Sequence, residues 1–424
     1  MNIEISSPVK EYDVIVIGGG PAGCAAAIAA ARNGVSVLVI EASTALGGMA
    51  TIGMVSKWAP FTDKQKVIYK SIPLEIMKKY KAAANIPEDK WDWVNIIPEK
   101  LKIVYDDMLI ESGAEVLFES RVCQTVVKDG NIDLVIVANK SGLTPYRAHT
   151  YIDCTGDADV AFMSGVPCEK GDELGNIQPS SLCFAICNVD MEKVPFTLSS
   201  GPVDGFWGKL KAAGKFNLTC KHFIPAIIGN TILANAGHLF DVDSTNPQEV
   251  TKALIKGRKI AEEYLELLKE GIPEAFKDAF IVCTSNVLGV RESRRIEGEY
   301  RLTMEDYALR RSFPDEIARN CYWLDCHAGP GKKMAVQIPP EKRHYLPGES
   351  HGIPFRCLIP KKLDNLFVAG RSISMERMVL SSVRVMPNCL AMGEAAGIGA
   401  AISVKESCGV HAVDVKKVIE KINC

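Results

Sequence analysis

The fold is decided by Tyr12-Asp-Val-Ile-Val-Ile-Gly-Gly-Gly-Pro-Ala-Gly23, which is followed by an alanine-rich run and then by Val35-Ser-Val-Leu-Val-Ile-Glu41. The apolar run from Val14 to Ile17 has the length of a buried strand, and it breaks into the pattern Gly18-x-Gly20-x-x-Gly23. In such a unit the first glycine allows a tight turn and the second lets the backbone approach a pyrophosphate. The third lets the next helix pack against the sheet. The stretch therefore predicts that a dinucleotide binds at the N-terminus of a helix.

The expected helix covers residues 21–33. Pro21 suits a first helical turn, because its missing N–H is no loss there. The N–H groups of that turn, which includes Ala22, would face the phosphates. Glu41 closes the second strand, where an acidic side chain can take the hydroxyls of a ribose, and Ala42 follows it.

The composition is that of an ordinary globular enzyme. The chain has 424 residues, room for two or three domains, with 47% hydrophobic and 24% charged residues. A net charge of −2 gives no basic field for nucleic acid or an anionic membrane. The longest apolar region is interrupted by glycines, Arg32 and Asn33, short of the roughly 20 apolar residues of a membrane span. Residues 1–10 lack a signal pattern, so we expect a cytoplasmic protein without an integral membrane segment.

Cysteine is plentiful, at 14 residues, but forms no CxxC pair. In a chain without an export signal, scattered cysteines are expected to be reduced thiols packed as small hydrophobes. A redox-active pair or a metal site is the alternative. The poor grouping of His with Cys argues against zinc, and no metal is expected.

A small-residue loop follows the second strand and contains Gly47 and Gly48, with Met49 next. Two adjacent glycines would let the backbone pass close to a second segment of the ligand. A plain flexible loop is the alternative. Residues 60–97 are more polar, with a helix expected over 66–83, and we interpret them as a covering excursion.

The sheet is expected to continue after a helix over residues 98–113. Strand patterns follow over 115–119, 122–128 and 132–138, with Asp129-Gly-Asn as a hairpin-type turn between the last two. Val122, the first residue of its strand, is included among the expected cofactor contacts.

Two later strands also end in glycine. One covers 148–154 and ends in Thr155-Gly-Asp157, and the other is Leu366-Phe-Val-Ala, which leaves through Gly370. Such ends suit a sheet edge that faces a nucleotide, although ordinary strand-to-loop glycines are nearly as common. A helix with proline at its start and small residues up to Ile402 follows, and its N-terminus would stabilise negative charge. The residues expected at the cofactor in these blocks are Thr155, Gly156, Asp157, Gly370, Arg371, Arg384, Pro387 and Asn388.

Residues 166–357 have a different texture, with scattered asparagine, proline and aromatic residues. A strand-like run covers 181–189, and a helix is expected over 247–270 with Asn246 as its N-cap. We therefore predict a substrate or cap domain, 166–357, inserted into a cofactor domain formed by 1–165 and 358–424.

Three separated blocks together resemble the FAD-dependent oxidoreductases of the glutathione-reductase-like fold. They are Gly18 to Gly23 with Glu41 and Gly47-Gly48, then Asp153 to Ala161, then Leu366 to Arg371 with the Pro387 helix. Within that group, Gly289 to Thr303, Asp325-Cys-His327 and Ser382 to Pro387 look like a bacterial subfamily of mostly unknown substrate. The resemblance implies non-covalent FAD in an α/β protein. It implies a Rossmann-like FAD-binding domain, a parallel sheet with helices, and an inserted α+β substrate domain. It also implies that the N-terminus of the Pro387 helix faces the flavin pyrimidine carbonyl.

Two positions depart from that pattern. Arg371 follows Gly370, where many relatives place an aspartate that holds the ribityl chain, so this contact is left unassigned. Met49 follows the glycine pair near the place where succinate-oxidising relatives carry a histidine bonded to the flavin. This difference argues against a covalent bond.

The first candidate for proton transfer is His327, because the unperturbed pKa of histidine lies near working pH. Asp325 would orient it if the two residues lie on a strand, where residues two apart point the same way. A hydrogen-bonded structural histidine is an equally weighted alternative. His222, His238 and His351 have no supporting context.

A second cluster consists of Arg291, Arg294 and Arg295. On a strand, Arg291 and Arg295 would share one face and Arg294 would point away. Arginine can hold a carboxylate through two parallel bonds, so an acidic organic substrate is plausible. Internal salt bridges to Glu292, Glu297 and Glu299 are the alternative. We take Arg294 and Arg295 with His327 and Asp325 as the candidate catalytic residues.

The sequence thus predicts a flavoenzyme that oxidises or reduces a small organic molecule by hydride transfer at FAD. It shows no second GxGxxG unit for a nicotinamide nucleotide and no CxxC for a disulfide relay, so the electron donor or acceptor is unidentified. One alternative is an isomerase or hydratase that uses FAD without net redox turnover. Another is a non-enzymatic flavin-binding protein. The oligomeric state is left open, with a homo-oligomer as one option.

Overall fold

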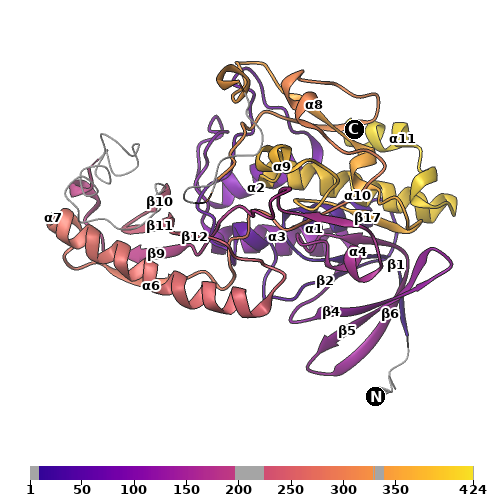
Figure 1. The fold of residues 1–424 in the computed structure, drawn as a ribbon, viewed down its shortest axis with the longest axis horizontal. Helices are drawn as coiled ribbons and strands as arrows, with labels where there is room; N and C mark the ends of the chain where they lie inside the picture. Colours follow the sequence, from indigo (N-terminus) through magenta and orange to yellow (C-terminus); the bar gives the residue numbers. More distant parts are fainter. Residues whose placement is uncertain (1–8, 196–223, 328, 330–338, 424) are drawn as a thin grey trace.

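The computed structural model describes residues 9–195, 224–327, 329 and 339–423. Its central sheet joins strands that are far apart in the sequence (Figure 1). The strand order β3-β2-β1-β6 is parallel throughout, and β17 pairs with β6 in the same sense. These strands are β1 (Lys10–Ile17), β2 (Val37–Ile40), β3 (Glu115–Leu117), β6 (Gly142–Asp153) and β17 (Leu366–Val368). The predicted α/β class with a Rossmann-like parallel sheet is confirmed.

An antiparallel meander extends this sheet through β4 (Arg121–Lys128) and β5 (Asn131–Asn139). Strand β6 is longer than the predicted 148–154 because it has two partners along one edge. Its first half pairs with β5, and its last residues pair with β17. The sequence signal at 148–154 came only from the half buried in the parallel sheet.

Small residues bring the first and last long helices together. Helix α1 (Pro21–Arg32) packs on α10 (Met386–Glu406), with α2 (Ser71–Ala83) and α3 (Pro98–Ser112) beside them. A Cβ atom at Gly393 would lie 2.0 Å from Ala22 O, and one at Gly397 would lie 2.1 Å from Ala26 O. Only glycine permits this approach of the two backbones. The predicted helix over 66–83 is correct in kind but begins at Ser71, because Lys70 is extended.

A separate antiparallel sheet has the order β10-β11-β9-β13 and lies with α6 at one end of the molecule, far from the C-terminal helices (Figure 1). Its elements are β9 (Phe184–Cys187), β10 (Ile224–Ile228), β11 (Thr231–Asn235), β13 (Phe280–Thr284) and α6 (Pro247–Gly271). The side chain of Asn246 caps α6 by accepting from Gln248 N and Glu249 N, as predicted. The strand-like run over 181–189 contains strand β9, but its first residue belongs to β8 (Ser180–Ser181), and the two strands pair with different partners.

Apolar packing divides the inserted block. Buried apolar residues within 182–189 and 232–288 form their own core under α6, whereas those within 302–317 and 345–358 belong to the same core as α1 and α10. The domain limits at 165/166 and 357/358 stay a prediction. The shorter elements are α4 (Asp159–Met163), β7 (Cys168–Lys170), β12 (His238–Leu239), α7 (Pro273–Phe276), β14 (Arg294–Ile296), α8 (Met304–Ala308), β15 (Glu316–Asn320), β16 (His351–Pro354), α9 (Arg377–Val383) and α11 (Val415–Asn423).

In the part of the chain that the structure describes, no single helix is long and apolar enough to span a membrane. The bent pair α9 and α10, which meet at 96°, meets the length and composition test only when taken together.

Candidate active site

A cavity of about 640 Å³ lies along the carboxyl ends of the parallel strands. This edge of a parallel sheet is where ligands bind in open α/β folds, and the volume is that of a small-molecule site. Most of the residues predicted at the cofactor line it: Gly18, Gly20, Pro21, Ala22, Glu41, Ala42, Gly48, Met49, Val122, Thr155, Gly156, Asp157, Gly370, Arg371 and Arg384. His327 and Asp325 line the same cavity.

The three glycines of the turn meet different surroundings. Gly18 has φ +97°, and a Cβ there would lie 2.5 Å from Cys154 O. A Cβ at Gly23 would lie 1.8 Å from Gly18 O, so this glycine serves the packing of α1 and does not line the cavity. A Cβ at Gly20 would meet no atom within 4 Å, because it would project into the cavity. Gly20 is also the N-cap of α1, which has no side-chain cap and no acidic residue in its first turn.

Glu41 and the glycine pair are held against this turn. Buried Glu41 accepts hydrogen bonds from Gly19 N at 2.6 Å and from Ser43 N at 2.7 Å. Gly47 N donates to Gly19 O at 2.7 Å, and a Cβ at Gly48 would lie 3.0 Å from Gly20 Cα. Gly47 thus hydrogen-bonds the loop to the glycine turn, while Gly48 and Met49 line the cavity.

Two arginines mark the other half of the cavity. Arg371 donates from Nη2 to Asp157 Oδ1 at 3.0 Å, and Gly156, with φ +79°, leaves room for its guanidinium. Arg384 donates from Nη2 to Asp325 Oδ2 at 3.1 Å. Among the described residues, the buried Nε atoms of Arg371 and Arg384 have no hydrogen-bond partner. The N-terminus of α10 adds Val385, Met386 and Cys389 to the lining and has no side-chain cap.

Two predicted residues of α10 lie behind the cavity wall. Pro387 and Asn388 are buried and are not among the lining residues. Asn388 accepts from the Tyr69 hydroxyl at 2.6 Å and donates to Asn320 Oδ1 at 2.8 Å. These bonds fix the start of α10 against the core.

His327 and Asp325 are brought together, although neither lies on a strand. His327 Nε2 is 3.0 Å from Asp325 Oδ1, while Arg384 and the Tyr322 hydroxyl both donate to Asp325 Oδ2 at 3.1 Å. The two residues lie in a segment without regular secondary structure, so the strand parity considered from sequence does not account for their contact.

Burial and charge set the protonation of this pair. Burial lowers the pKa of His327 to about 4; the Asp325 hydrogen bond opposes that shift, and the positive charge of Arg291 adds to it. Burial alone would raise the pKa of Asp325, but the hydrogen bond to His327 and the charge of Arg384 hold it far below its usual range. At neutral pH the pair is therefore a neutral imidazole beside a carboxylate. Nε2 carries the ring proton and donates a hydrogen bond to Asp325, and the lone pair of the neutral ring is therefore on Nδ1.

The three arginines of the second cluster point to different places. Arg291 lines the cavity and donates from Nη1 to Pro179 O and Ser181 Oγ, both at 2.8 Å. Arg294 and Arg295 do not line it. Arg294 donates to Asp157 O and Asp159 Oδ1 and lies over the ring of Phe162. Of the three, only Arg294 and Arg295 lie on a strand, β14, so the shared face considered for Arg291 and Arg295 does not apply.

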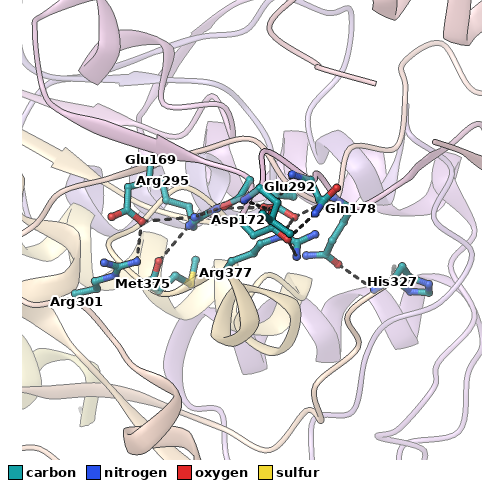
Figure 2. A network of polar contacts seen from close by, with 12 residues as sticks. Glu169, Asp172, Gln178, Glu292, Arg295, Arg301, His327, Met375 and Arg377 are labelled. Carbon is teal, nitrogen blue, oxygen red and sulfur yellow. Dashed lines mark hydrogen bonds and ion pairs between the residues drawn. The ribbon is translucent and has the colours of Figure 1, made fainter. Parts of the chain in front are cut away.

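Arg295 belongs to a buried ion network beside the site (Figure 2). Glu292 is fully buried and accepts from Arg295 at 3.2 Å and from Arg377 Nε at 2.9 Å. Gln178 N also donates to Glu292 at 3.0 Å, and Gln178 Oε1 lies 3.5 Å from His327 N. The Arg295 to Glu292 salt bridge, which was the alternative interpretation of this cluster, is therefore present, and the network reaches the backbone of His327.

Several cavity residues were not predicted as site residues. Trp93, Tyr322, Trp323 and His238 all line the cavity, and the ring centroid of His238 lies 4.9 Å from that of His327. The aromatic pair Tyr322-Trp323 directly precedes Asp325-Cys-His327, which was the one available sequence signal. His351 is buried against Tyr345, and His222 lies outside the described residues.

Comparison with known proteins shows the family of this chain. A model of the family "FAD dependent oxidoreductase" matches residues 13–422. The chain belongs to this family. FAD is therefore the cofactor of this protein, and the protein is an oxidoreductase.

The chain is similar to a thiamine thiazole synthase of Methanococcus aeolicus, with 28% identity over 178 residues, 40% of this chain and 63% of that protein. It is 41% identical over 61 residues to the fumarate reductase (cytochrome) of Shewanella frigidimarina, 14% of this chain and 11% of the relative. It thus spans less than two thirds of the length of these relatives. A solved geranylgeranyl bacteriochlorophyll reductase-like protein of Thermoplasma acidophilum aligns over 98% of this chain and 83% of its own, with 14% identity and a TM-score of 0.46.

The residues present fit FAD. The open space at Gly20 lies at the uncapped N-terminus of α1, which suits a pyrophosphate. The unsatisfied Nε atoms of Arg371 and Arg384 are donors without an acceptor in the described protein, and buried donors normally have one. The side chains of Arg371 and Arg384 line the cavity, at which a second uncapped helix begins.

Proposed function

We propose that this protein oxidises or reduces a small carboxylate-bearing molecule by hydride transfer at non-covalently bound FAD. We place it with the glutathione-reductase-like fold and with the bacterial subfamily of mostly unknown substrate. The observation that carries the proposal is the His327 to Asp325 pair, which lines the same cavity as the glycine turn.

The cofactor would extend along the cavity. Its ADP half would lie on the Gly18 to Gly23 turn, with Glu41 at the ribose and Val122 near the adenine end. Its other half would be held near Gly370, Arg371 and the start of α10. These residues line one continuous cavity or support its wall.

When bound, FAD supplies the centre that accepts or donates a hydride. The protein must hold the substrate beside the flavin and transfer the proton that accompanies the hydride. In the oxidising direction, a C–H bond gives up its hydrogen with two electrons, and the neighbouring O–H or N–H gives its proton to Nδ1 of His327. Asp325 stabilises the imidazolium that forms, in the way that a carboxylate orients a catalytic histidine elsewhere. In the reducing direction both transfers are reversed, so His327 must first take up a proton at Nδ1 before it can donate one to the substrate.

Arg291 is the residue we propose for the substrate carboxylate. It lines the cavity, and its charge is felt by His327, Asp325 and Tyr322 alike. Arg384 is partly occupied by Asp325 and is better placed to steady the histidine pair or the reduced flavin. Arg294 and Arg295 do not line the cavity and are paired with Asp159 and Glu292, so their role in our proposal is structural.

The test is an anaerobic screen in which small carboxylates are mixed with the FAD-loaded enzyme and flavin bleaching is followed. His327→Asn should keep FAD but lose a factor of about 10² to 10⁴ in the reduction rate, the usual contribution of a general acid or base. His411→Asn is the control, because His411 pairs with Glu299 away from the cavity.

An unchanged rate in His327→Asn would remove His327 from the mechanism. A flavin that stays oxidised while substrate turns over would favour the isomerase or hydratase alternative. The electron partner and the cytoplasmic location stay predictions.

A further inference from the structure

The substrate end of the cavity has an aromatic wall, defined here as Trp93, Tyr322 and Trp323. The Tyr322 and Trp323 rings are stacked, with centroids 4.5 Å apart and planes at 28°. Trp93 lies 5.4 Å from Trp323 and 6.2 Å from Tyr322. All three line the cavity that holds His327. The wall joins two loops that are more than two hundred residues apart in sequence.

Trp93 is not a core residue. It is 39% exposed, whereas the nearby Trp58 is fully buried. Its φ of +52° is in the left-handed region, which is costly for a bulky side chain. Asp92 holds the neighbouring backbone by accepting from Phe61 N and Thr62 N, both at 3.0 Å. A large indole kept partly exposed at a cavity by a strained backbone indicates a contact surface for a ligand.

The aromatic wall is tied directly to the proton-transfer pair. The ring of Tyr322 stacks on Trp323, and its hydroxyl donates to Asp325. The His327 ring also meets His238 edge-on, at an interplanar angle of 80°. Other lining residues at this end, Ala236, Leu288 and Val290, are apolar. A ligand bound here therefore contacts aromatic faces and apolar side chains, with His327 and Arg291 in the same cavity.

We infer that the substrate is an aromatic or heteroaromatic acid, whose ring packs on the aromatic wall while its carboxylate meets Arg291. This inference rests on the proposed function and names its substrate class. Aromatic pairs favour offset or edge-to-face contacts and bind beyond what their buried area gives. A flat ring suits such a wall, whereas a puckered ring of the same size keeps the area but loses the π contact.

The experiment compares benzoate with cyclohexanecarboxylate as ligands of the FAD-loaded enzyme, with perturbation of the flavin absorption spectrum as the readout. The two acids share the carboxylate and a six-membered ring and differ in the π face. Benzoate is expected to bind about 2- to 13-fold more tightly, the range that corresponds to one aromatic pair. Trp323→Leu and Trp93→Leu should each reduce this preference. Trp91→Leu is the matched control, because Trp91 packs on Lys81 and does not line the cavity.

Equal affinities for the two acids overturn the inference and leave the proposed function standing. A preference that survives both wall variants also overturns it. If neither acid perturbs the flavin, the carboxylate part of the proposed function fails first, and this inference fails with it. Should Trp323→Leu not fold, Trp93→Leu decides alone, because that side chain is partly exposed.

Discussion

Replacing Gly20 with alanine separates cofactor binding from folding. The residue has φ −70° and ψ −176°, a conformation open to any amino acid, and a Cβ there meets no protein atom within 4 Å. Loss of chain entropy in the unfolded state favours alanine by about 0.4–1 kcal/mol. Alanine is a poorer N-cap than glycine by a comparable amount. The apo-protein should therefore keep its stability to within about 0.5 kcal/mol, since these two terms nearly cancel.

The cofactor should feel the methyl group strongly. An extra methyl in a close-packed contact costs about 1–3 kcal/mol, which corresponds to a Kd for FAD that is about 5- to 150-fold weaker. Gly20→Val, with a branched side chain, should yield colourless protein. Gly23→Ala is the opposite case, because its Cβ would lie 1.8 Å from Gly18 O inside the protein. That variant should lower the Tm of the apo-protein itself.

The assay removes FAD, measures thermal denaturation of each apo-variant, and then titrates FAD back by the quenching of its fluorescence. Gly20→Ala with the Kd of the unaltered protein would refute the placement of the pyrophosphate at this turn. Gly23→Ala with an unchanged Tm would refute the packing role of the third glycine.

The remaining predictions concern protonation, buried charge and helix capping. Burial lowers the pKa of His327 to about 4, whereas an unfolded histidine titrates near 6.5. The free energy of unfolding should therefore fall as pH drops from about 6.5 to about 4, and His327→Asn should lose less stability over that range. Arg291→Gln should raise this pKa, and an NMR titration in which His327 is assigned from His327→Asn would contradict the reasoning if the pKa did not move. Glu292→Gln should cost up to about 3–5 kcal/mol in chemical denaturation, because the buried Arg295 and the largely buried Arg377 lose the carboxylate they share and keep only Glu169 and Asp172. Asp190→Asn, at an exposed pair with Lys193, should change nothing measurable, and equal losses in the two variants would contradict the claim. Asn246→Ala should cost about 1 kcal/mol through the lost cap of α6, whereas Asn246→Asp, which keeps an acceptor, should cost little; equal melting curves for these two variants would show that the cap is unimportant.

The cofactor half of the site was predictable because its signals are local. The Val14 to Ile17 strand, the glycine turn and Glu41 are consecutive in the chain, and each residue type is required by its own backbone geometry. The Asn246 cap and the small residues of α10 were readable for the same reason.

The substrate half was less predictable because tertiary contacts decide it. Arg294 and Arg295 had the right chemistry, but Arg294 pairs with the partly exposed Asp159 and Arg295 with the buried Glu292, and neither arginine lines the cavity. Trp93 and Trp323 lie in loops that are far apart in the sequence. Neither has a periodic pattern around it from which their contact could be predicted.

The close contact between α1 and α10 also governs how this protein is made. Helix α1 leaves the ribosome well before Gly393 and Gly397, the glycines that pack on it, because more than 350 residues separate them. At usual synthesis rates the interval between them is roughly 20 to 70 seconds. During that time the alanine-rich face of α1 has no partner, and the strand β17 that completes the cavity edge does not yet exist. We therefore expect FAD to be loaded only after residue 397 has been synthesised, and we expect shorter nascent chains, in which α1 has no partner, to be prone to aggregation.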